Sequence, residues 1–258
     1  MIAYPRIIAH RCGGALAPEN SLAGLAIAAR LGCRAVEFDV MLSADGVPLL
    51  IHDETLRRTT TGRGRVAEMT LAEIRRFDAG GPHHAAFAVA PAPTFSEAMA
   101  ECRRLGLWPN IEIKPASGHD ESTGETVARW LGEHWDGTGV ISSFSEKSAL
   151  AARRVLPQFP QALLVEQLPD DWQAQLERRG AIALHLAAKY LKPRQAAALN
   201  DAGVIWAAYT VNDRASGERL FALGAAALFT DRPDLWLPEE MWAPAPEKIR
   251  AREACSPD

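Results

Sequence analysis

Segments typical of strands and of helices alternate along this chain, and this alternation restricts the folds open to it more than any other feature. Nine short apolar or β-branched runs are typical of strands. They lie at residues 6–9, 35–40, 48–52, 110–114, 140–143, 162–165, 183–186, 204–209 and 226–229. Helical segments rich in Ala and Leu separate most of them. This order predicts parallel strands joined by right-handed helical crossovers.

One connection is too short for such a crossover. Residues 41–47 join the expected strands 35–40 and 48–52 and contain an Asp45-Gly46 turn sequence. A parallel connection needs about a dozen residues or more, whereas a short turn joins an antiparallel hairpin. With 48–52 set aside as an excursion, eight parallel strands remain. We therefore predict an α/β fold, a (β/α)₈ TIM barrel with a small insertion after its second strand.

The length of 258 residues agrees with one barrel of about 250 residues. We predict a single barrel domain over residues 1–242, with an insertion at the barrel mouth over about 53–93. A flexible tail is expected over 243–258, which is rich in Pro and charge. We also expect one helix near 71–77 and a weak helix at 238–242.

Capping residues indicate where several helices begin. A side-chain oxygen just before a helix satisfies backbone N–H groups of its first turn, and a Glu three residues later completes a capping box. The expected caps are Asn20 or Ser21, Thr94 with Glu97, Ser122 with Glu125, and Asn212 or Asp213.

Charge, hydropathy and cysteine usage argue against several classes of protein. The net charge of −4 and pI of about 6.0 argue against nonspecific nucleic-acid binding, which needs a basic face. No stretch approaches the roughly 20 apolar residues of a membrane span. Residues 1–9 are too short for a signal peptide and are interrupted by Pro5. The 4 cysteines form no CxxC pair, which indicates reduced thiols and a cytoplasmic protein.

Polar side chains gather at the C-terminal ends of the first strands, where a TIM barrel has its active site. They are His10, Arg11, Glu37, Asp39, His52, Asp53, Glu112 and Lys114. Because side chains alternate along a strand, Glu37 and Asp39 share one face of theirs, as do Glu112 and Lys114. We expect Phe38 between the first pair to face the helical shell. A cluster of this kind is difficult to explain by structural roles alone.

Three carboxylates, those of Glu37, Asp39 and Glu112, would converge inside the mouth. Carboxylates at close quarters repel one another unless a cation lies between them. Oxygen ligands favour a hard divalent ion, so we predict Mg²⁺, Mn²⁺ or Ca²⁺. Zinc prefers more nitrogen or sulfur ligands.

Six sequence strings resemble those of the glycerophosphodiester phosphodiesterase family, most closely its bacterial cytoplasmic members. They are AHRCGGALAPENSLAGL (9–25), VEFDVMLSADGVPLLIHDETLRRTTTGRG (36–64), NIEIKP (110–115), SSF (142–144), YTVN (209–212) and FTD (229–231). The resemblance implies a (β/α)₈ barrel that hydrolyses glycerophosphodiesters to sn-glycerol 3-phosphate and an alcohol.

The resemblance also implies roles for the residues at the strand ends. The three carboxylates would bind the metal, and His10 and His52 would form the acid/base pair. Arg11 and Lys114 would bind the phosphoryl oxygens. It leaves open which histidine is the acid. It also leaves open whether the nucleophile is the neighbouring glycerol hydroxyl, which gives a cyclic phosphate, or water.

Further residues are assigned more loosely. The resemblance places Glu19 and Asn20 near the site, although a role as helix cap suffices to explain Asn20. Cys12 stands where the family usually has Gly, and we expect it to be tolerated. Tyr209 replaces a Trp found in many members and would keep an aromatic wall.

Two residues have open interpretations. Phe144 either lines the site or packs in the core. His185 either lines the pocket or is a hydrogen-bonded core histidine. Neither choice follows from the sequence.

Two other functions compete with this one. A related barrel phosphodiesterase of the phospholipase D type would act on lysophospholipids. A degenerate barrel would bind phosphorylated glycerol without turnover, but it should have lost one of the key groups, and all are present here. The preferred alcohol, the metal and the oligomeric state do not follow from the sequence.

Overall fold

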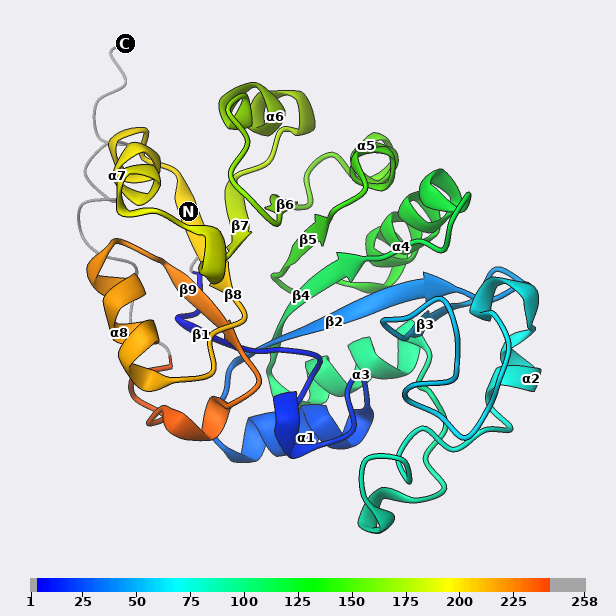
Figure 1. Cartoon of the computed structure of the whole chain (residues 1–258). Coiled ribbons are helices and arrows are strands. Elements are labelled where there is room, and N and C mark those ends of the chain that lie inside the picture. Colours follow the sequence, from blue (N-terminus) through cyan, green and yellow to red (C-terminus); the bar gives the residue numbers. More distant parts are fainter. Residues whose placement is uncertain (1–3, 242–258) are drawn as a thin grey trace.

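The computed structural model describes residues 4–241, in which eight parallel strands close into a barrel (Figure 1). They are β1 (Ile7–Ala9), β2 (Ala35–Leu42), β4 (Trp108–Ile113), β5 (Val140–Ser143), β6 (Gln161–Val165), β7 (Ala183–Ala187), β8 (Ile205–Tyr209) and β9 (Ala227–Thr230). β1 pairs with both β2 and β9, which closes the sheet. The predicted TIM barrel is confirmed.

The excursion also has the predicted form. β3 (Pro48–Leu50) pairs antiparallel with β2, with Val40 opposite Leu50. It is shorter than the expected 48–52 because the ladder ends at Leu50, and the next backbone N–H, that of Ile51, donates to the Asp39 carbonyl at 3.1 Å. The hairpin of β2 and β3 thus projects beyond the barrel wall (Figure 1).

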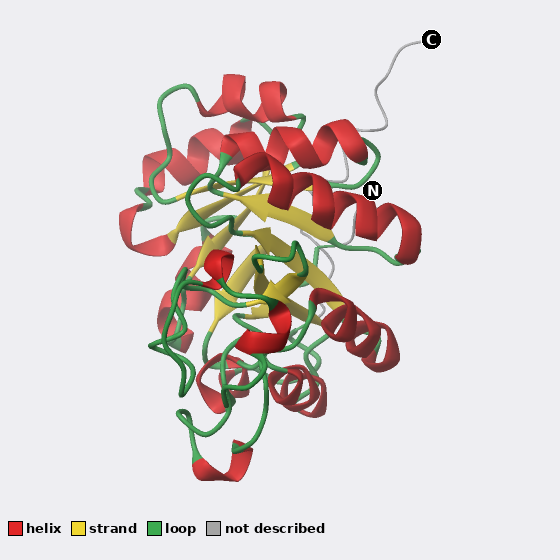
Figure 2. Cartoon of the chain, turned by 90° about the vertical axis from the view of Figure 1, so that its right-hand side faces the viewer, coloured by secondary structure: helices red, strands yellow, loops and turns green. Residues whose placement is uncertain are grey.

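Helices cover the outside of the strands (Figure 2). They are α1 (Leu22–Arg30), α3 (Phe95–Leu105), α4 (Asp120–His134), α5 (Glu146–Val155), α6 (Trp172–Arg179), α7 (Pro193–Asp201) and α8 (Arg214–Ala222). The short helix α2 (Leu71–Ile74) lies in the insertion instead (Figure 1). No helix within residues 4–241 is long and apolar enough to cross a membrane.

Most predicted helix starts are correct. Thr94 and Glu97 form a capping box, and the Asp213 side chain caps α8. The predicted box at Ser122 is wrong: α4 begins at Asp120, and the Ser122 hydroxyl donates to the His119 carbonyl at 3.1 Å.

Two expected helices differ from the structure. The helix expected at 71–77 is only the four-residue α2. Residues 238–241 form a turn closed by the Met241 N–H and the Pro238 carbonyl, and Trp242 lies outside the described residues.

Apolar side chains fill two layers. Phe38, Ile111 and Ile113 face the helices as predicted, and Phe38 meets Phe95 of α3 at 6.3 Å between ring centroids. Inside the barrel, small and aromatic residues form a second cluster, in which the Tyr4 and Trp108 rings lie 5.2 Å apart. This plug leaves the cavity at the C-terminal ends of the strands, as expected for this fold.

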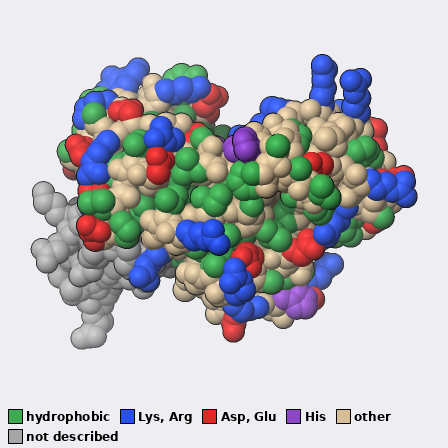
Figure 3. All heavy atoms as spheres, turned by 90° about the horizontal axis from the view of Figure 1, so that it is seen from below, with side chains coloured by type: hydrophobic (Ala, Val, Ile, Leu, Met, Phe, Trp, Pro, Cys, Tyr) green, Lys and Arg blue, Asp and Glu red, His purple; other side chains and the backbone are tan. Residues whose placement is uncertain are grey.

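Residues 53–93 pack on the β2–β3 extension (cyan in Figure 1). Leu56, Val66 and Ile74 form a small core with Met41 and Leu49 of the hairpin. The division into one barrel domain with an insertion stays a prediction, and the expected tail at 243–258 lies outside the described residues. On the face shown in Figure 3, basic side chains are scattered among acidic and apolar ones.

Candidate active site

Strand register brings the acidic residues together. In the parallel pair β2–β4, Asp39 lies opposite Glu112, and Glu37 lies opposite Asn110. The alternation that sends Phe38 outward turns Glu37 and Asp39 inward. Ligand oxygens of the three carboxylates all lie within 4.8 Å of one another. The predicted convergence of Glu37, Asp39 and Glu112 is therefore present in the structure.

Burial gives this cluster unusual acid–base properties. Glu37 and Asp39 are only 2% exposed. Burial, together with the Asp39 charge, raises the pKa of Glu37 to about 7 and that of Glu112 to about 8. The pKa of Asp39 itself is lowered, because Lys114, His52 and Arg11 outweigh its burial.

The cluster fits a hard divalent cation. One oxygen of Glu37 and one of Glu112 are buried without a hydrogen-bond partner. Buried polar atoms are normally paired, and a carboxylate oxygen without a donor suits a cation. The donor set contains oxygen alone, which agrees with Mg²⁺, Mn²⁺ or Ca²⁺ better than with zinc.

A tight turn after β1 positions Arg11 against the cluster. Arg11 and Cys12 have φ angles of 49° and 76°, and the Arg11 N–H donates to Glu37 Oε2 at 2.9 Å. Gly14 (φ 60°) is required here, since a Cβ at this position would lie 2.4 Å from the Asp231 carbonyl oxygen. The Arg11 guanidinium lies 3.8 Å from Asp39.

His10 ends β1 and bonds to an acidic residue from β9. Its Nδ1 lies 2.7 Å from Asp231 Oδ1, and its Nε2 lies 3.8 Å from Glu37. The Asn212 amide donates to the other Asp231 oxygen at 2.8 Å. Burial would lower the pKa of His10, but the Asp231 hydrogen bond and the Glu37 charge outweigh it and raise the pKa.

His52 has the corresponding arrangement at the end of the hairpin. Its Nδ1 lies 2.7 Å from Asp53 Oδ1, and its Nε2 lies 2.7 Å from Lys114 Nζ. Lys114 also lies 3.7 Å from Asp39 and 3.5 Å from Glu112. Burial lowers the pKa of His52 despite the nearby carboxylates.

Glu19 and Asn20 lie at this site, but each contacts protein groups. Glu19 accepts hydrogen bonds from Arg11 at 3.1 Å and from Arg58 at 2.6 Å. Asn20, with φ 55°, donates to Asp39 at 2.9 Å and accepts from the Asp39 N–H at 3.0 Å. The interpretation of Asn20 as the helix cap is wrong, because the Ser21 hydroxyl caps α1.

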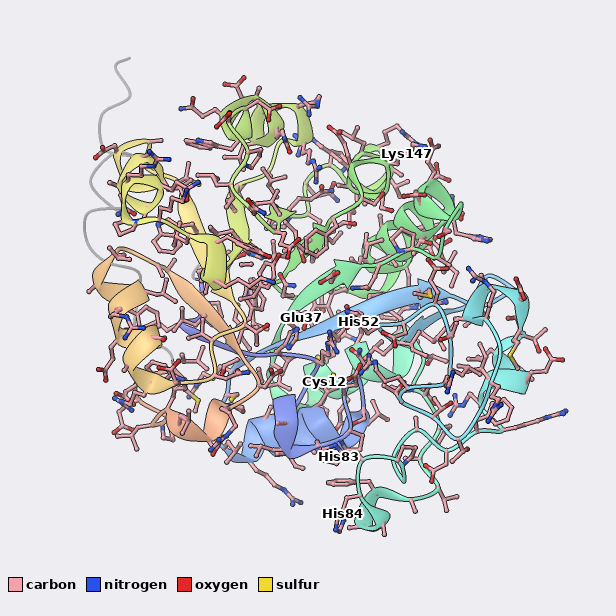
Figure 4. The ribbon with its side chains drawn as sticks, in the orientation of Figure 1. Cys12, Glu37, His52, His83, His84 and Lys147 are labelled. Atoms are coloured by element: carbon pink, nitrogen blue, oxygen red, sulfur yellow. The ribbon has the colours of Figure 1, made fainter. Side chains whose placement is uncertain are left out.

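A cavity of about 270 Å³ joins these groups to the other side of the barrel. Phe144 and Tyr209 line it, and Phe144 is 49% exposed. His185 also borders it, but its ring is 0% exposed and hydrogen-bonds to Tyr4, which favours the core interpretation. Figure 4 shows Glu37 and His52 near the barrel axis and His84 farther out in the insertion.

Comparisons with known proteins identify the group to which this chain belongs. A family model described as the glycerophosphoryl diester phosphodiesterase family matches residues 10–235. The chain belongs to this family.

Individual relatives agree with this family assignment. A glycerophosphodiester phosphodiesterase of Caldanaerobacter subterraneus is 32% identical over 88% of this chain and 94% of its own. An Oleispira antarctica phosphodiesterase, solved with the product sn-glycerol-3-phosphate, has a TM-score of 0.87 at 34% identity over 90% of this chain and 94% of its own. A glycerophosphodiester phosphodiesterase of Agrobacterium tumefaciens has a TM-score of 0.73 at 30% identity over 90% of this chain and 98% of its own.

In this family member, sequence reasoning missed several polar groups around the site. They are Arg58, Asn110, Ser142, Glu166, Asn212 and Asp231. Asp231 follows β9 directly, so the strand-end signal used for His10 and His52 also applied to it. Asp53 is among the predicted strand-end residues with His52, but the sequence did not predict its bond to the His52 ring. Arg58 lies in a loop and offers no such signal.

Proposed function

We propose that this protein hydrolyses glycerophosphodiesters to sn-glycerol 3-phosphate and an alcohol, with one divalent cation. The observation that carries the proposal is the pairing of two histidines, each bonded to an aspartate, beside a buried cluster of three carboxylates. Family membership and the similarity to a phosphodiesterase solved with sn-glycerol-3-phosphate support the choice of substrate.

Glu37, Asp39 and Glu112 would hold the cation, which is Mg²⁺, Mn²⁺ or Ca²⁺. When bound, it would offset negative charge on the phosphoryl oxygens as the transition state forms. Arg11 and Lys114 would bind the same oxygens, since both reach this cluster. An acidic chain thereby gains a local positive site for an anionic substrate.

His10 and His52 would transfer the protons. With Nδ1 donating to Asp231 or Asp53, each ring presents Nε2 to the site. One histidine would take a proton from the nucleophile, and the other would give one to the leaving alcohol. Either histidine suits either role, and the nucleophile is either the adjacent glycerol hydroxyl or water.

Other residues would support these groups. Glu19 orients Arg11 through its hydrogen bonds, and Phe144 and Tyr209 bound the space for the substrate. We further propose a single barrel domain and a cytoplasmic location without nucleic-acid partners. Cys12, Cys33 and Cys102 are buried and free, as a reducing compartment would permit.

Release of sn-glycerol 3-phosphate from glycerophosphocholine tests the activity. We expect turnover by purified protein, loss of turnover after dialysis against EDTA, and recovery with Mg²⁺, Mn²⁺ or Ca²⁺ added singly. Undiminished turnover in excess EDTA contradicts the metal. Faster cleavage of lysophosphatidylcholine identifies the phospholipase-type function instead, and tight binding without turnover identifies a non-catalytic barrel.

A further inference from the structure

One rim of the cavity combines aromatic and acidic side chains. Phe144 follows β5, Tyr209 ends β8, and Glu166 follows β6. All three line the same cavity as Arg11 and Lys114. β6 lies four strands from β1 in either direction around the barrel, so Glu166 is on the far side from Arg11.

The aromatic pair is held in place. The Phe144 and Tyr209 rings meet edge to face, with centroids 6.2 Å apart and an angle of 89° between the rings. The Tyr209 hydroxyl donates to the Val165 carbonyl at 2.8 Å, next to Glu166. The two rings therefore form a corner beside the Glu166 carboxylate.

A ligand reaches this rim more readily than the floor of the cavity. Phe144 is 49% exposed and the Glu166 side chain is 57% exposed. His185 and Ser142 border the same cavity but are 0% and 1% exposed. The groups available to the part of a substrate beyond the phosphate thus include the corner and the carboxylate, beside the exposed Thr210.

Charge is divided across the cavity. Arg11 and Lys114 lie beside the carboxylate cluster, and of the described residues that line the cavity Glu166 is the acidic one outside that cluster. Its ion pair with Lys189, at 3.3 Å, is exposed on both sides. Such surface pairs contribute only about 0–1 kcal/mol, so a ligand cation can compete with Lys189.

We propose that this rim selects glycerophosphodiesters whose alcohol carries an ammonium group, such as choline or ethanolamine. Aromatic faces attract quaternary and primary ammonium ions, and a carboxylate adds charge complementarity. The phosphate would lie near Arg11 and Lys114, and the ammonium near Glu166, Phe144 and Tyr209. This inference rests on the proposed hydrolysis and names the substrate class of that site.

The test compares kcat/KM for glycerophosphocholine and glycerophosphoglycerol, which has a neutral alcohol. For Glu166→Gln we expect kcat/KM for glycerophosphocholine to fall about 3–10-fold through KM, and that for glycerophosphoglycerol to change less than about twofold. Phe144→Leu should lower the preference for choline about 2–5-fold. Lys189→Ala, which frees Glu166, should raise it.

Glu121→Gln is the matched control. The Glu121–Arg154 pair is similar in distance, 3.4 Å, and in exposure, 63% and 58%, but Glu121 does not line the cavity. We expect no change in either substrate.

An unchanged substrate ratio in Glu166→Gln, or an equal fall for both substrates, overturns the inference while the hydrolysis stands. If the wild type hydrolyses neither substrate, the proposed function fails instead. Titration calorimetry with glycerophosphocholine then decides the inference: weaker binding to Glu166→Gln than to the wild type supports it, and equal binding overturns it.

Discussion

The two halves of the barrel have the same backbone architecture but different chemistry. At the mouth, β1, β2 and β4 contribute charged groups such as Asp39, Glu112 and Lys114. In the facing half, β5 to β8 contribute mainly neutral groups such as Ser142 and Leu164 to the same cavity, with Glu166 after β6 as the acidic residue on its rim. The fold supplies equivalent positions all around the mouth, and the sequence concentrates charge in one half of them.

The charged half is tolerated because its charges compensate one another. An isolated buried charge is costly, whereas a paired and hydrogen-bonded one is not. His10 bonds to Asp231, and Lys114 lies within 4 Å of Asp39. Among the described carboxylates, only Glu37 and Glu112 have a buried oxygen without a hydrogen-bond partner, and these oxygens mark where a cation would bind.

Removal of a histidine from the charged half should have the largest effect. We expect His10→Ala and His52→Ala each to lower kcat by about 10²–10⁴-fold, the usual contribution of a general acid or base. The measurement is turnover of glycerophosphocholine. Circular dichroism should show an unchanged fold, because both rings are partly exposed at the mouth.

A mutant that keeps more than about a tenth of wild-type turnover contradicts the acid/base role of that histidine. His134→Ala is the matched control. This histidine is exposed at the end of α4 and does not line the cavity at the mouth, so its loss should leave kcat unchanged.

The next effect concerns the two aspartates behind the histidines. Asp231→Asn and Asp53→Asn should lower kcat/KM by about 10–100-fold, as loss of an orienting carboxylate commonly does. Because Asp231 raises the pKa of His10, Asp231→Asn should also move the limb of the pH–rate profile that His10 controls to lower pH.

The shift of the pH–rate profile distinguishes loss of the Asp231–His10 bond from general damage to the fold. Asp136→Asn, at an exposed surface ion pair with Arg103, is the control and should change neither rate nor profile. A lower rate with an unmoved profile would argue against the role of Asp231.

Local patterns predicted most of the fold and the charged half of the site. Period-two alternation placed Glu37 and Asp39 inward and Phe38 outward, and the short hairpin link reduced nine strands to eight parallel ones. The capping box predicted at Ser122 is wrong because the helix begins two residues earlier, at Asp120. There, Asp120 accepts a hydrogen bond from Ser145 of the next helix start, a contact between segments distant in sequence.

Some of the contacts that were not predicted depend on long-range packing. Asp231 meets His10 only because β9 pairs with β1, although the two residues are far apart in sequence. Asn20 has a positive φ and its side chain bonds to Asp39. From the local sequence, the same residue could equally be the cap of the helix that follows. Such long-range pairs are not encoded in any one segment.

In the facing half of the barrel, His185 should affect stability and not catalysis. Burial lowers its pKa to about 3, below the usual value of 6.5, so the unfolded chain binds this proton first as the pH falls. Stability from this group is therefore complete above about pH 6.5 and is lost below it, by about 1.4 kcal/mol per pH unit.

Urea unfolding of the wild type and His185→Phe at pH 7 and pH 5 tests this. The stability difference between the two proteins should shift in favour of the variant by about 2 kcal/mol at the lower pH. Titrations of the carboxylate cluster are common to both proteins and cancel. A constant difference would show that His185 is not buried in neutral form, and His185→Gln serves if the Phe variant packs poorly.

The smallest effect is expected at Cys12, which marks the border between the charged mouth and the core. Its neighbour Arg11 faces the carboxylates, whereas the Cys12 side chain is 0% exposed and packs against Gly24 of α1. Cys12→Gly relieves a φ of 76°, a conformation that costs a side chain roughly 1–2 kcal/mol, but it loses a buried thiol and adds freedom to the unfolded chain. These contributions oppose each other, so stability should change by less than about 1 kcal/mol and kcat by less than about twofold.

Burial also raises the pKa of the Cys12 thiol, so a thiol reagent should leave it unlabelled in the native protein, as peptide mapping would show. Labelling of Cys12 with loss of activity would contradict this prediction, because it would show that the side chain is accessible from the mouth.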